Sequence, residues 1–117
     1  MNNYWYAVIG YAFLIFILSS IPLAIGQGSG FDKVIHAIEY AIFGVILYMA
    51  MSHSKSKSIV KNAVLLVLVI GVFYAISDEI HQYFVPNRSM DAFDALADSV
   101  GVLVGAILAK LKKDRQF

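Results

Sequence analysis

The chain has no cysteine among its 117 residues. This excludes disulfides, thiolate catalysis and metal sites with sulfur ligands. Charged residues make up only 15% of the chain, against about 25% in soluble domains. Apolar residues make up 60%, whereas a soluble domain of this length needs a polar surface to cover its core. The composition therefore indicates a single integral membrane domain, residues 1–117.

No charged residue precedes Asp32. The first apolar run, Tyr4–Ile25, can span a bilayer, because a helix needs about 20 apolar residues to do so. A signal peptide is an alternative, but the run has no Lys or Arg before it and exceeds the usual length of such a segment. Apolar runs at about 33–51, 63–84 and 93–109 predict three further spans. We therefore expect an all-α bundle of four transmembrane helices.

Basic residues concentrate in the connector between the second and third spans and after the fourth. Seven of the nine lie there: Lys55, Lys57, Lys61, Lys110, Lys112, Lys113 and Arg115. An even number of spans places this connector and both termini on one side, which the positive-inside rule makes cytoplasmic. The sequence thus predicts a multi-pass protein of the bacterial cytoplasmic (inner) membrane with cytoplasmic termini.

The stretch Asp78–Asp98 holds five of the eight acidic residues of the chain and lies between two apolar runs. Ionisable groups are costly to place in a membrane, so such groups are functional, paired or both. With the predicted topology, the polar residues of 32–40, 78–88 and 91–98 converge at the outer end of the bundle.

Helical spacing predicts which of these side chains share a face. His36 and Tyr40 lie one turn apart, as do Glu79 and Gln82, whereas Glu79 and His81 point in different directions.

Two acids and two glycines form one stripe along the fourth span: Asp94, Asp98, Gly101 and Gly105. Small residues spaced by four allow a neighbouring helix to approach closely. We expect the fourth helix to pack in the bundle interior, with both aspartates turned toward the polar centre.

The order and spacing of these residues resemble the VanZ-like family of bacterial membrane proteins. Three segments carry the resemblance: Asp32-Lys33-x-x-His36-x-x-x-Tyr40, Glu79-x-x-Gln82-x-x-x-Pro86-x-Arg88, and Asp94-x-x-x-Asp98-x-x-Gly101-x-x-x-Gly105. The family pattern commonly has Asn where this chain has Asp98. The resemblance implies a small helical protein of the cell envelope. The protein that gives the family its name is associated with low-level resistance to teicoplanin-type glycopeptides, and the resemblance supplies no reaction.

The first functional hypothesis is a site for the polar head group of an envelope lipid or lipid-linked precursor, reached from the outer leaflet. His36 is the candidate general base or acid, oriented by Glu79 or Asp94. Arg88 offers a planar fork for phosphate or carboxylate. The other candidate ligand-binding residues are Asp32, Lys33, Tyr40, Gln82 and Asp98.

Three alternatives stay open. A divalent cation could bind the same acidic groups, although no recognised metal-binding spacing favours it. A proton-coupled transporter would use the intramembrane acids. In a structural or partner-binding protein, these polar residues would serve only to hold the helices of the bundle together.

The basic tail is too short, and too close to a span, to indicate binding of nucleic acid. The oligomeric state is left open.

Overall fold

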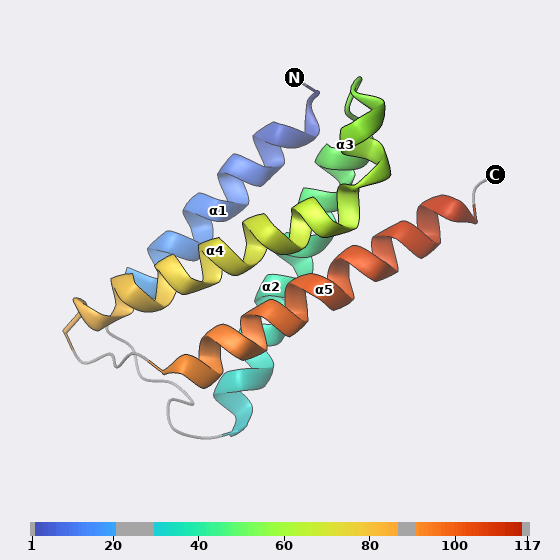
Figure 1. The fold of residues 1–117 in the computed structure, drawn as a ribbon. Coiled ribbons are helices and arrows are strands. Elements are labelled where there is room, and N and C mark those ends of the chain that lie inside the picture. The colour runs from blue at the N-terminus through green and yellow to red at the C-terminus, as the bar shows by residue number, and fades with distance from the viewer. Residues whose placement is uncertain (1, 21–29, 87–90, 116–117) are drawn as a thin grey trace.

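The computed structural model describes residues 2–20, 30–86 and 91–115, and for residues 30–32 only the backbone. Across these residues the chain is all-α, as predicted. Four long helices and one short helix follow in the order α1 (Tyr4–Ser20), α2 (Gly30–Ser52), α3 (Lys57–Lys61), α4 (Ala63–Tyr83) and α5 (Ala92–Asp114) (Figure 1).

Three helices are long and apolar enough to cross a membrane: Lys33–Ser52 within α2, the whole of α4 and the whole of α5. They match the second, third and fourth predicted spans. α1 is apolar but shorter, with 17 residues. The predicted first span continues to Ile25, and residues 21–25 lie outside the described residues. The structure is compatible with a helical membrane bundle: three helices are long and apolar enough to span, and a fourth apolar helix is shorter.

The largest differences from the sequence prediction are a longer α5 and an additional short helix. α5 continues past the predicted end at residue 109 to Asp114, because the basic tail also favours a helix. Lys110 Nζ donates to Asp114 Oδ2 at 2.9 Å, one turn on, and cations near a helix C-terminus interact well with its dipole. In the expected connector, Ser56 caps the short helix α3 by accepting a hydrogen bond from the Ile59 N–H.

The outer surface of the bundle is apolar. Large apolar side chains are exposed on all four long helices, among them Phe13, Ile38, Phe73 and Leu96. An apolar surface of this extent is unfavourable in water and suits lipid chains.

The interior is built around close contact between α2 and α5. A Cβ atom placed on Gly101 would overlap the carbonyl oxygen of Ala37, and one on Gly105 would overlap that of Ala41. Glycine is therefore required where the two backbones meet. The predicted stripe is confirmed, since Asp94 and Asp98 are buried on the same face of α5 as the glycines.

The two ends of the bundle differ. The start of α1, the helix α3 and the C-terminal end of α5 lie at the same end of the bundle (Figure 1). Asn2 Nδ2 donates to the Ala50 carbonyl at 3.0 Å, and Lys113 Nζ donates to the Ser52 carbonyl at 2.8 Å. The basic connector and the ends of the described chain thus share one end, as the sequence predicts. That this end faces the cytoplasm stays a prediction.

Candidate functional site

Polar side chains from three helices meet at the opposite end of the bundle. They come from the first half of α2, the last turns of α4 and the first turns of α5. Seven of them are buried: His36, Tyr40, Asp78, Glu79, Gln82, Asp94 and Asp98. The convergence of distant polar segments is therefore confirmed for the described residues, and we call these seven the polar cluster.

His36 and Asp98 form the centre of the polar cluster. The ring Nδ1 of His36 lies 3.1 Å from Asp98 Oδ1, within hydrogen-bonding distance. Asp98 is completely inaccessible to solvent. This hydrogen bond restrains the orientation of the imidazole ring. Asp98, expected among the ligand-binding residues, is thus the group that orients His36 in this structure.

Glu79 approaches the same centre from α4. Its Oε2 atom accepts a hydrogen bond from the backbone N–H of Asp91 at 3.0 Å, which ties the end of α4 to the start of α5. In the part of the chain that the structure describes, its Oε1 atom is buried without a hydrogen-bond partner, and so is Oδ2 of Asp98. Buried polar atoms without partners are rare and unfavourable, so these two oxygens require an explanation.

Asp78 and Tyr40 form a second buried pair beside this centre. The Tyr40 hydroxyl donates to Asp78 Oδ2 at 3.0 Å. Asp78 was not a candidate from the sequence. Its position one turn before Gln82, a candidate on the same buried face of α4, was the signal that could have identified it.

Lys33 lies at the rim of the polar cluster. Its ammonium donates to Asp91 Oδ2 at 3.0 Å and to Asp94 Oδ1 at 3.1 Å. Asp91, also absent from the sequence candidates, caps α5 by accepting from the Phe93 N–H. The Lys33 ammonium and this N–H hold the pKa of the Asp91 carboxyl below its usual value, so the cap remains ionised. Asp94, expected as a possible orienting group for His36, is hydrogen-bonded to Lys33.

A family model described as VanZ/LLP1 matches residues 2–113, nearly the whole chain. The chain belongs to the VanZ/LLP1 family. The resemblance seen in the sequence is thereby confirmed. No curated protein and no solved structure matches the chain.

Two candidate residues of this VanZ/LLP1 protein cannot be placed. Arg88 and the side chain of Asp32 lie outside the described residues. The proposed contact between Arg88 and a phosphate or carboxylate therefore stays a prediction.

His81 is not part of the polar cluster. Its Nε2 atom lies 2.8 Å from Ser20 Oγ, and its ring stacks on Phe16 of α1. Glu79 is buried while His81 faces α1, which confirms the expectation that these two side chains point in different directions.

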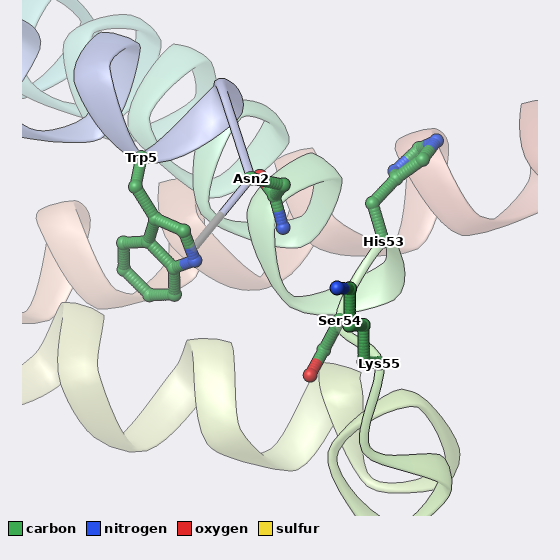
Figure 2. Close-up of a pocket in the computed structure, with 5 residues that line it drawn as sticks. All are labelled: Asn2, Trp5, His53, Ser54 and Lys55. Atoms are coloured by element: carbon green, nitrogen blue, oxygen red, sulfur yellow. The ribbon is translucent and has the colours of Figure 1, made fainter.

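An open pocket of about 270 Å³ with both polar and apolar lining lies at the basic end of the VanZ/LLP1 bundle. Figure 2 shows the five residues that line it: Asn2, Trp5, His53, Ser54 and Lys55. None of these five residues was a candidate site residue. His53 lies at the opposite end of the bundle from His36, so a substitution of His53 serves as a control for a substitution of His36.

Proposed function

We propose that this VanZ/LLP1 protein binds or acts on the polar part of an envelope lipid or lipid-linked precursor through the polar cluster. One observation carries the proposal: four carboxyl side chains and a histidine are buried at one end of an otherwise apolar bundle. Inserting an aspartate at the centre of a membrane helix costs about 2.5–3.5 kcal/mol on insertion scales. Hydrophobic side chains of similar volume would hold the helices together without that cost.

The chemistry of the described site favours a ligand rich in hydroxyl or amino groups. The carboxylates of Glu79 and Asp98 accept hydrogen bonds, and Lys33 at the rim adds a cation for an acidic group. The acyl chains of such a ligand would lie against the apolar outer faces of the helices. Arg88 is proposed to hold a phosphate or carboxylate of the same molecule.

His36 is the group best suited to move a proton in this site. It is the buried imidazole of the polar cluster, and Asp98 fixes its ring. An imidazole held by a carboxylate can act as a general base and return the proton as a general acid. A reaction at the head group would therefore use His36, with Glu79 and Asp94 as the other candidate catalytic groups.

Membership of the VanZ/LLP1 family supports a link to glycopeptide resistance. We propose that the polar cluster faces the outer leaflet of the bacterial inner membrane, where a lipid-linked precursor would reach it. Expression of the protein should then lower the susceptibility of a host to teicoplanin.

The test compares variants in a glycopeptide-susceptible bacterium. His36→Ala, Glu79→Gln, Arg88→Ala and Asp94→Asn should each abolish the protection that the wild-type protein gives, measured as the minimal inhibitory concentration of teicoplanin. His53→Ala is the matched control, because His53 lies exposed at the basic end, and it should behave as wild type. Immunoblots of membrane fractions must show equal insertion.

A second measurement identifies the bound molecule. Wild-type protein extracted in mild detergent should carry a lipid or precursor detectable by native mass spectrometry, and Glu79→Gln should lose it. Normal protection and unchanged lipid content in well-inserted variants would instead assign the polar cluster a structural role.

A further inference from the structure

One potential ligand atom from each of His36, Glu79 and Asp98 lies within 4.8 Å of the other two. The three residues come from α2, α4 and α5, and all are buried. We propose that they bind one divalent cation of the zinc or manganese class. This inference does not depend on the proposed function, because it rests on the geometry of the three side chains.

The buried oxygens without partners provide the independent observation. Glu79 Oε1 and Asp98 Oδ2 belong to residues that are 2% and 0% exposed, and neither atom has a hydrogen-bond partner among the described residues. Leaving an ionised carboxylate oxygen unpaired in an apolar interior costs much more than leaving a neutral group unpaired. A cation between the two carboxylates would satisfy both atoms at once.

Glu79 is already oriented through its other oxygen. Its Oε2 atom is held by the Asp91 N–H at 3.0 Å. Metal-binding carboxylates are commonly held by such secondary hydrogen bonds, which fix the direction of the ligating atom. The neighbouring acids are occupied elsewhere, since Asp78 accepts from Tyr40 and Asp94 from Lys33.

The spacing of the donor atoms suits direct ligation. Adjacent ligands around a metal with bonds of about 2.1 Å lie about 3.0–3.4 Å apart, and the His36–Asp98 distance of 3.1 Å agrees. The cation would replace the proton shared by these two atoms, and that proton would be released to solvent. Asp98 would then ligate through both carboxylate oxygens, which also satisfies Oδ2. At tetrahedral angles the ligand atoms lie about 3.4 Å apart. A pair now as much as 4.8 Å apart would have to close by about 1.4 Å at most, shared between two side chains.

The donor set indicates the class of cation. Imidazole nitrogen favours Zn²⁺ and similar transition metals, and carboxylate oxygen also suits Mn²⁺. Two carboxylates neutralise a divalent cation, which reduces the cost of burying all three charges in the bundle. Three protein ligands leave a coordination position for water or a head-group oxygen, as in catalytic zinc sites.

The sequence disfavoured a cation because it contains no recognised metal-binding spacing. The ligands come from three separate helices, so their spacing along the chain carries no such signal.

The test uses purified full-length protein in detergent, stripped with a chelator and then titrated with Zn²⁺ or Mn²⁺ alone. Calorimetry and elemental analysis after desalting should show one bound ion per chain. Glu79→Gln and Asp98→Asn should each weaken binding at least about tenfold, the lower limit expected even for losing a supporting residue. Asp114→Asn and His53→Gln, which remove exposed titratable groups at the basic end, should bind as wild type.

A spectroscopic measurement on the wild-type protein avoids dependence on the folding of the variants. Bound Mn²⁺ should show hyperfine coupling to nitrogen in protein labelled with ¹⁵N-histidine. The proposal is wrong if the wild type retains neither ion after desalting, if that coupling is absent, or if folded Glu79→Gln and Asp98→Asn bind as tightly as wild type. The last result would assign the bound ion to the surface.

Discussion

At the scale of single residues, the hydrogen bond between Tyr40 and Asp78 links the apolar core to the polar cluster. Tyr40 is fully buried, and its ring lies against Phe43 and Tyr74 within the apolar core. Its hydroxyl reaches from this core to Asp78 in the polar cluster. One side chain therefore joins the two parts of the interior.

Tyr40→Phe should destabilise the protein while keeping its core volume. The substitution removes the donor to Asp78 Oδ2 and leaves a buried acceptor unpaired. Hydrogen bonds in membrane proteins contribute about 0.6–2 kcal/mol, and we expect a loss of this size. Unfolding by SDS in mixed micelles, followed by circular dichroism, measures it. Tyr6→Phe, at an exposed position of α1, is the control, and an equal effect of the two changes would contradict the role given to the Tyr40 hydroxyl.

The sequence predicted which residue types would gather but not how they would pair. Helical spacing along one helix predicted that His36 and Tyr40 share a face. The partners of these two residues, Asp98 and Asp78, lie on other helices, and pairing across helices depends on the rotation of each helix. That rotation is set by packing, which helical spacing alone does not specify.

At the scale of helices, contact between α2 and α5 determines the geometry of the site. Gly101 and Gly105 let α5 approach the backbone of α2 at Ala37 and Ala41. Asp98 lies on the same face of α5, less than one turn before Gly101. A change in the separation of these helices would therefore move Asp98 relative to His36.

Gly105→Ala should destabilise the bundle, because the added Cβ would overlap the Ala41 carbonyl oxygen, and a backbone atom cannot rotate away. Overpacking of this kind typically costs about 1–3 kcal/mol. Gly10→Ala in α1 is the matched control, since its added Cβ meets no described atom within 4 Å beyond the neighbouring backbone of its own helix. We expect that control to remain within about 1 kcal/mol of wild type, because alanine favours the helix. SDS unfolding measures both, and equal stabilities would contradict close packing at Gly105.

The long helices were predictable from the sequence because each is an apolar run of spanning length. The α5 stripe was predictable because its acids and glycines recur at helical spacing. The helix α3 and the C-terminal extension of α5 were not predicted, since both are polar. Their helical form depends on local hydrogen bonds, the Ser56 cap and the Lys110–Asp114 pair, rather than on apolar periodicity.

At the scale of the whole molecule, the bundle has an acidic end and a basic end. The polar cluster occupies the first, and the start of α1, the helix α3 and the end of α5 occupy the second (Figure 1). The four long helices run alternately up and down, and this places the basic segments at one end and the acidic segments at the other (Figure 1). The positive-inside rule then predicts which end faces the cytoplasm.

Single-cysteine labelling tests this orientation directly, because the wild-type chain has no cysteine to remove. Lys57→Cys places a thiol in α3, and Phe84→Cys places one just after α4, both at exposed positions. A membrane-impermeant maleimide should label Phe84→Cys in intact spheroplasts and Lys57→Cys only in inverted vesicles or after permeabilisation. Labelling of Lys57→Cys from outside would place the polar cluster on the cytoplasmic side. A head group of the outer leaflet could not then reach it, and the proposed function would lose its substrate.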